Sequence, residues 1–180
     1  MKILVLYYTL DGNTEAVGHA IAERTGADEA KLVRVKRVRP YTRFRKFKAH
    51  MEVLRKSKPD IFPFKWDPRD YDLIFIGTPV WYDSFNPVFN TLFSVIKIYD
   101  RKVALFSCGE TDSTKALKKF AEMLQDSVII DKKHWIEPLW WDDDAETEKA
   151  LKEAADWGEE IAGIAEKMIE EEELNRRVLY

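Results

Sequence analysis

The sequence predicts an α/β protein with a doubly wound, five-stranded parallel sheet and helices on both faces. Short apolar runs alternate along the chain with segments whose apolar residues recur at helical spacing. Most of the runs are continuous rather than alternating, which is typical of parallel strands buried on both faces. Five strand-and-helix units in succession favour a single sheet with right-handed crossovers.

The first half of the chain predicts two strands and two helices. A buried strand is expected over residues 3–7, followed by a helix from Asn13. Residues 31–38 alternate apolar and basic side chains, which predicts a half-exposed edge strand that Pro40 ends. A helix over residues 42–56 is expected to bury a face made of Phe44, Phe47, Met51 and Leu54.

The second half predicts three further units. Strands are expected over residues 72–77, over 103–106 and in the regions 128–130 and 135–139. Asn86 followed by Pro87 predicts a helix start. The buried faces of the three helices are expected to be, in order, Val88, Leu92, Val95 and Ile96; then Ala116, Leu117, Phe120, Met123 and Leu124; and, after a start at 142–144, Leu151, Ala154, Ala155, Ile161, Ala165 and Met168. A buried first strand beside an edge second strand favours the sheet order 2-1-3-4-5.

Composition limits the class of protein. The chain has 180 residues, of which 46% are apolar and 34% charged, and this balance excludes disorder and a membrane span. We expect one domain over residues 1–180. A single cysteine excludes a disulfide framework and predicts a cytoplasmic protein. The three histidines are scattered without metal-ligand spacing, so no metal site is expected.

The turn after the first strand is the strongest candidate for a binding site. It has the sequence Thr9-Leu10-Asp11-Gly12-Asn13-Thr14 and opens the first helix. Backbone N–H groups at a helix N-terminus favour an anion such as phosphate, and the hydroxyl and amide side chains can add hydrogen bonds. Asp11 is the unfavourable member because its carboxylate would repel a phosphate. Its side chain is therefore expected to point outward or to cap the turn.

Two further loops follow the third and fourth strands. The third strand continues into Thr78-Pro79-Val80-Trp81-Tyr82, and the fourth into Ser107-Cys108-Gly109-Glu110-Thr111. Together with the turn at 9–14, these segments resemble the flavodoxin family, and the resemblance extends from residue 1 to about residue 169. The dinucleotide-binding fold is excluded, because the turn has one glycine instead of three and the second strand is basic.

The resemblance implies FMN as the cofactor. Flavodoxins have the sheet order 2-1-3-4-5 and hold FMN at the switch point between strands one and three. The turn at 9–14 would bind the FMN phosphate with neutral donors, and Trp81 would stack on the inner face of the flavin ring. Thr78, Pro79, Val80 and Tyr82 would lie around the ring, as would Ser107, Cys108, Gly109, Glu110 and Thr111. Cys108 is expected to fill space rather than to act as a redox thiol. The resemblance implies no catalytic side chain.

Two features depart from typical flavodoxins. Residues 107–114 contain no aromatic residue that could cover the outer flavin face. That face is then either open to a substrate or covered by Trp135, Trp140 or Trp141. The net charge is only −3, because residues 34–58 contain eleven Lys or Arg against Glu52 alone. This basic segment is either a solvated face or a docking surface for an acidic redox partner or a nicotinamide dinucleotide.

Three functions are compatible with the sequence. The first is an electron carrier that serves a reductase and acceptor proteins. The second is an FMN-dependent reductase that uses NAD(P)H on a quinone or another small acceptor. The third is an interaction module without a cofactor. Asp11 favours this function, because its carboxylate would repel the phosphate of a cofactor. Nucleic acid is not expected as a partner, because no basic face combines with exposed aromatic platforms. A homo-oligomer is left open.

Overall fold

The sheet has five parallel strands in the order β2-β1-β3-β4-β5, as the sequence predicts. A computed structural model describes residues 1–36, 43–111, 114–139 and 143–178 of the chain. The strands are β1 (Ile3–Tyr7), β2 (Asp28–Lys31), β3 (Leu73–Pro79), β4 (Lys102–Gly109) and β5 (Val128–Ile136). Tyr7 lies opposite Gly77, and Gly77 lies opposite Phe106. The carboxyl ends of β1, β3 and β4 therefore meet at one edge of the sheet.

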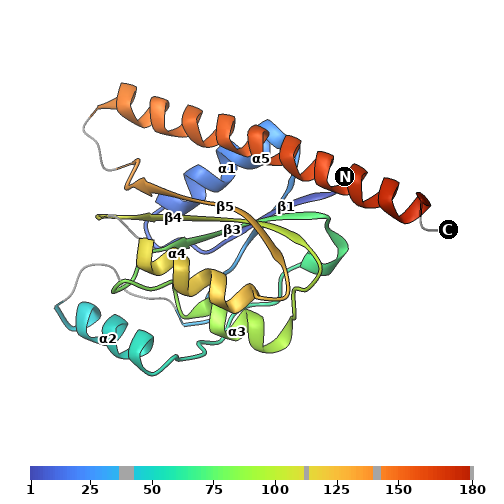
Figure 1. The fold of residues 1–180 in the computed structure, drawn as a ribbon. Coiled ribbons are helices and arrows are strands. Elements are labelled where there is room, and N and C mark those ends of the chain that lie inside the picture. Colours follow the sequence, from blue (N-terminus) through green and yellow to red (C-terminus); the bar gives the residue numbers. More distant parts are fainter. Residues whose placement is uncertain (37–42, 112–113, 140–142, 179–180) are drawn as a thin grey trace.

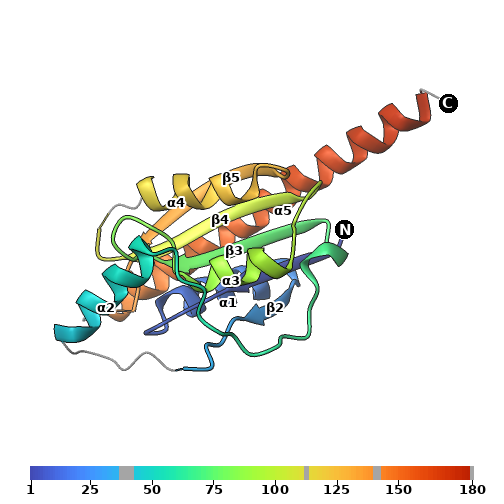
Figure 2. The same ribbon diagram turned by 90° about the horizontal axis from the view of Figure 1, so that it is seen from below.

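The helices form a layer on each face, which confirms the doubly wound architecture. Figure 1 shows α1 (Asn13–Thr25) and α5 (Asp144–Val178) on one face, with α3 (Val88–Val95) and α4 (Thr114–Ala121) on the other. The helix α2 (Arg43–Leu54) lies at the side of the molecule, near the carboxyl ends of the strands. Figure 2 shows that α5 continues well beyond the sheet. Two short 3₁₀ helices, Pro68–Asp70 and Glu122–Leu124, complete the elements.

Two hydrophobic cores hold the layers together. Val17, Ile21, Trp157 and Ile161 pack against one face of the sheet, and Phe89, Leu92 and Phe120 pack against the other. The Phe106 ring lies directly over Gly77, so that a Cβ at residue 77 would overlap the ring. A glycine at this position therefore allows the ring to cover the end of β3.

The edge strand is placed differently from the prediction. The structure puts β2 at Asp28–Lys31, and only Lys31 falls within the expected range of 31–38. Leu32 and Arg34 are buried, whereas Val33 and Val35 are exposed. Arg34 turns inward because its guanidinium donates to both carboxylate oxygens of Glu52, at 2.9 and 3.2 Å. A buried ion pair thus determines which residues face inward, and residues 37–38 lie outside the described part.

Three predicted buried faces are partly wrong. The helix expected at 42–56 forms as α2, but Phe47 and Leu54 are 66% and 63% exposed, and Ala49 is buried instead. The side chain of Phe44 lies outside the described residues. Val95, the last residue of α3, is 72% exposed, whereas the next residue, Ile96, packs against the core. In the face expected after β4, Met123 is 43% exposed, because it lies in the 3₁₀ helix that follows α4 instead of continuing the α-helix.

The last two elements form with shifted limits. The two expected segments at 128–130 and 135–139 are one continuous strand that ends at Ile136, so Leu139 lies in the following loop. The final helix begins at Asp144 and buries Ala154, Ile161 and Ala165 as expected, together with Trp157. Among the described residues, no helix is both long and apolar enough to cross a membrane. The single-domain organisation stays a prediction.

Candidate functional site

Three loops meet where β1, β3 and β4 end. The order of the strands in the sheet reverses between β1 and β3, which makes this edge the topological switch point. The turn 9–14 follows β1, the segment 80–87 follows β3, and the segment from Glu110 follows β4. In open α/β sheets, ligands bind in the crevice at such a switch point. The topology thus brings the three segments that the sequence singles out to one edge.

The turn after β1 leaves several backbone donors unpaired. Gly12 has a φ of 104°, a conformation that glycine adopts without strain, and its N–H donates to Thr9 Oγ1 at 3.0 Å. The first helical hydrogen bond runs from the Ala16 N–H to the Gly12 carbonyl. Within the described chain, no hydrogen bond uses the N–H groups of the residues around Gly12, namely Leu10, Asp11, Thr14 and Glu15. They form the donor set that an anion requires.

Two hydroxyl groups add to this donor set. Thr9 Oγ1 accepts from Gly12, so its own proton remains available to donate. Thr14 is fully buried, and its Oγ1 has no oxygen or nitrogen partner in the described structure; the Cys108 thiol, a weak hydrogen-bonding group, is its polar neighbour. A thiol satisfies a hydroxyl only weakly, and a bound oxyanion would be a stronger partner.

Asp11 caps the turn, one of the two arrangements that the sequence allows. Its Oδ1 accepts from the Asn13 side-chain amide at 3.3 Å and, more weakly, from the Asn13 backbone N–H at 3.5 Å. The carboxylate is exposed but lies on donors of the helix start. Asp11 thus accepts from Asn13 at the start of α1, next to the unpaired N–H groups of the turn.

The loop after β5 also reaches the turn, which sequence reasoning missed. The Leu139 N–H donates to Asn13 Oδ1 at 2.8 Å, and the Leu139 side chain lies against Gly12. The two residues that form the bond are 126 positions apart, so no local pattern points to it. Asn13 is thereby buried and bonded at both ends of its amide.

The electrostatics of the site are negative. Burial raises the pKa of the Glu137 carboxyl, and the nearby charges of Glu110 and Asp11 raise it further. Among the ion pairs of the described residues, none joins a lysine or arginine to these three carboxylates. Within the described residues, no paired cation therefore balances these three carboxylates.

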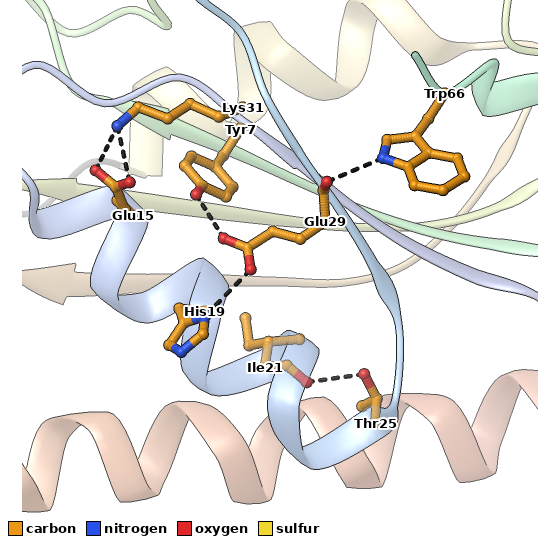
Figure 3. Close-up of polar contacts among 8 residues, drawn as sticks. All are labelled: Tyr7, Glu15, His19, Ile21, Thr25, Glu29, Lys31 and Trp66. Carbon is orange, nitrogen blue, oxygen red and sulfur yellow. Dashed lines mark hydrogen bonds and ion pairs between the residues drawn. The ribbon is translucent and has the colours of Figure 1, made fainter. Parts of the chain in front are cut away.

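The carboxylates on the outer side of α1 are balanced, in contrast. Figure 3 shows Lys31 of β2 donating to both oxygens of Glu15, at 2.7 and 2.6 Å. Glu29 accepts from Tyr7 and pairs with His19, and its hydrogen bond to His19 and its charge raise the pKa of His19. Glu15 and Glu29 are thus paired, in contrast to Asp11, Glu110 and Glu137.

The loop after β3 begins with a threonine whose hydroxyl is already used. Thr78 is fully buried, and its Oγ1 accepts from the Asn86 N–H at 2.9 Å and donates to the Pro79 carbonyl. Asn86 Oδ1 in turn accepts from the Val88 N–H at the start of α3, as the Asn86-Pro87 pattern predicts. Thr78 therefore fixes the loop, and its hydroxyl is not free for a ligand.

A tight turn places Trp81 and Tyr82. Trp81 and Ser84 exchange backbone hydrogen bonds of 2.8 and 3.0 Å, and the intervening Tyr82 and Asp83 have φ values of 50° and 54°. Non-glycine residues in this conformation are strained, and such strain clusters at functional sites. Lys119 of α4 holds the turn by donating to the Asp83 carbonyl at 2.8 Å.

The two aromatic residues of this turn differ in exposure. Trp81 is only 8% exposed, so a ring that stacks on it has to displace the groups that cover it. Tyr82 is 46% exposed, and the His50 ring of α2 meets its ring edge-on with a centroid separation of 4.7 Å. The helix α2 therefore lies directly beside this turn.

The loop after β4 supplies backbone more than side chains. Ser107 is buried and shares a 3.0 Å hydrogen bond with His134 of β5. Cys108 is buried beneath the turn, and burial raises the pKa of its thiol, which fits a space-filling role. The Val80 N–H donates to the Cys108 carbonyl, and Val80 lies so close to Gly109 that a Cβ there would crowd it. Glu110 and Thr111 are exposed at the rim.

Trp135 cannot cover the outer face of a ligand at these loops. It is buried under α5 and packs edge-on against Trp157, 5.5 Å between ring centroids. Residues 140 and 141, the other two tryptophans that could cover this face, lie outside the described residues.

Asn86 adds a donor that the sequence does not reveal, since its buried Nδ2 has no partner within the described part of the chain.

The comparisons with known proteins agree with the fold. A family model described as flavodoxin matches residues 2–137. A flavoprotein in complex with FMN from Lactobacillus acidophilus NCFM is 23% identical, covers 83% of this chain and 97% of its own, and superposes with a TM-score of 0.65. The oxidised flavodoxin 2 from Bacillus cereus is 20% identical over 91% and 99% of the two chains, with a TM-score of 0.55.

A third structure widens the range of relatives. The WrbA-like flavodoxin from Agrobacterium tumefaciens is 13% identical over 92% of this chain and 98% of its own, with a TM-score of 0.54. At these identities the likeness to solved structures shows the fold alone. The family model covers most of the chain, and the chain therefore belongs to the flavodoxin family.

Proposed function

We propose that this protein binds FMN at the switch point of the sheet and serves as an electron carrier between a reductase and acceptor proteins. The observation that carries the proposal is the turn after β1, with its unpaired N–H groups and the buried hydroxyl of Thr14, which has no oxygen or nitrogen partner among the described residues. A similar chain is described as a complex with FMN.

The turn suits a phosphate through neutral donors. Hydrogen bonds from N–H and hydroxyl groups to a charged acceptor contribute about 1.5–3 kcal/mol each. The donors of Leu10, Thr14 and Glu15 lie at the start of α1, where the helix dipole also favours an anion. Thr9 can add its hydroxyl proton. This set can bind a phosphate without a basic side chain.

The two other loops suit a flat aromatic ring. When bound, FMN would supply the redox chemistry, and the protein would set its position and its potential. The strained turn at 81–84 would present Trp81 to one face, and the backbone from Ser107 to Gly109 would line the edge. Glu110 and Glu137 would disfavour extra negative charge on the reduced ring, so the proposal includes a low potential.

The partner surface is proposed to lie on α2 and the residues just after it. Phe47 and Leu54 are exposed on this helix, whose His50 ring contacts Tyr82 in the turn after β3. Four exposed basic side chains surround them, and none is in an ion pair with another described residue: Lys48, Arg55, Lys56 and Lys58. Apolar side chains ringed by unpaired positive charge fit an acidic redox protein.

A reductase that takes electrons directly from NAD(P)H is the second candidate. It is favoured by the absence of an aromatic residue between 107 and 111, which would leave the outer flavin face open to a nicotinamide. The two candidates separate in one assay. The FMN-loaded protein is mixed anaerobically with NADPH alone and then with NADPH plus a flavodoxin reductase. A carrier is reduced only after the reductase is added, whereas a reductase bleaches with NADPH alone.

A further inference from the structure

Asp11 brings a negative charge into the turn that is proposed to bind phosphate. Its Oδ1 lies on the Asn13 amide at 3.3 Å and near the Asn13 backbone N–H at 3.5 Å. A carboxylate that accepts at a helix N-terminus stabilises the helix start, as a bound anion does. Asp11 therefore makes contacts at the start of α1 of the kind that a bound anion would make.

The surroundings cannot neutralise both charges. Glu110 and Glu137 already share the neighbourhood of Asp11, and Lys31, the cation paired beside the first turn of α1, is bound by Glu15. A phosphate monoester adds a charge between −1.5 and −2 at neutral pH. Two anions on neighbouring donors repel one another, and solvent weakens this repulsion at an exposed carboxylate without removing it.

We propose that the Asp11 carboxylate competes with the flavin phosphate for the Asn13 donors and thereby sets the preference of this site between FMN and riboflavin. The inference rests on the proposed flavin site. Riboflavin lacks the phosphate and carries no charge, so its affinity should not depend on the charge of Asp11. The ratio of FMN affinity to riboflavin affinity should therefore be smaller with the Asp11 carboxylate present than it would be with the phosphate donors alone.

The test measures both flavins on matched variants. Apoprotein is titrated with FMN and with riboflavin, and binding is followed by calorimetry and by flavin fluorescence. Asp11→Asn keeps an acceptor oxygen for Asn13 and removes the charge, whereas Asp11→Ala removes both. Asp70→Asn is the matched control, because Asp70 precedes β3 at the opposite end of the sheet. Thermal unfolding of each variant checks that the fold is retained.

The expected result is specific to the phosphate. Asp11→Asn should bind FMN about tenfold more tightly than the wild type and riboflavin within about twofold of it, and the gain should shrink between about 50 and 500 mM salt. Asp70→Asn should leave both affinities unchanged. FMN binding by Asp11→Asn alone, with none by the wild type, would also support the competition.

Three results would overturn the inference. If both flavins bind and the ratio of their affinities stays the same in Asp11→Asn and Asp11→Ala, the carboxylate does not compete, and the proposed function stands without it. If FMN binding weakens in both variants, Asp11 supports the ligand rather than opposing it. If no variant binds either flavin, the proposed function fails together with the inference.

Discussion

Asn13 and Leu139 are joined by a 2.8 Å hydrogen bond, from the Leu139 N–H to the Asn13 side-chain oxygen. The bond ties the loop after β5 to the first turn of α1, across most of the length of the chain. The same Asn13 amide donates to Asp11, so one buried side chain holds the turn and the loop together. The shape of the anion site therefore depends on a residue far from it in sequence.

Replacement of Asn13 should destabilise the protein. Asn13→Ala leaves the Leu139 N–H without an acceptor, and the loss of a buried hydrogen-bond partner costs about 1–3 kcal/mol. Urea unfolding measures the change in the free energy of unfolding. Asn175→Ala, at an exposed position of α5, is the control and should be neutral. A change below about 0.5 kcal/mol for Asn13→Ala would show that the bond does not stabilise the fold.

The Glu137 carboxyl should make stability depend on pH. Burial and the charges of Glu110 and Asp11 raise its pKa in the folded protein, so the folded state binds this proton more tightly than the unfolded state. The contribution of Glu137 to stability therefore falls as pH rises from its unfolded pKa through its folded pKa. Glu137→Gln should be more stable than the wild type at pH 7, and the difference should vanish below about pH 4.

The comparison for this prediction is Glu122→Gln in the 3₁₀ helix after α4. Unfolding free energies are measured from about pH 4 to pH 8 for both variants. If Glu137→Gln is less stable than the wild type at pH 7, the carboxylate is held by favourable contacts instead of being repelled.

Trp81 should contribute to flavin binding through its ring. Trp81→Ala should weaken FMN binding by about tenfold or more, because an aromatic stack adds about 0.5–1.5 kcal/mol beyond the buried area. Trp81→Phe should lose less. Tyr99→Ala, an exposed aromatic residue just before β4, serves as the control. Equal FMN affinity for Trp81→Ala and the wild type would remove the indole from the site.

The basic surface around α2 should govern reaction with partner proteins. In Lys48→Glu combined with Arg55→Glu, the rate of electron transfer to an acidic redox protein should fall about tenfold at low salt. The difference from the wild type should disappear at about 500 mM salt. Lys167→Glu, at an exposed position of α5, is the matched control. Identical rates for the two charge variants would argue against α2 as the docking surface.

The strand order was predictable because the lengths and continuity of the apolar runs distinguish central strands from edge strands. Continuous runs at β1, β3 and β4 lie in the middle of the sheet, and the loops that follow them had to meet at one edge. The turn at 9–14 was predictable for the same reason. Even the capping role of Asp11 was one of two arrangements that charge repulsion allows, and the structure shows it.

Long-range pairing accounts for the parts that were missed. The inward turn of Arg34 depends on Glu52, and the position of Leu139 depends on Asn13. Periodicity within one segment carries no information about such partners. The exposed Phe47 and Leu54 mislead for another reason: an apolar stripe at helical spacing does not show whether the chain itself covers it.

Titration of the flavin-free protein with FMN tests the central claim most directly, namely that the unpaired donors between Leu10 and Glu15 hold a flavin phosphate. Heat release and quenching of flavin fluorescence are followed together. The account predicts saturable binding of one FMN per chain with a dissociation constant of about 1 µM or below. Neither heat nor quenching up to about 100 µM FMN would contradict it.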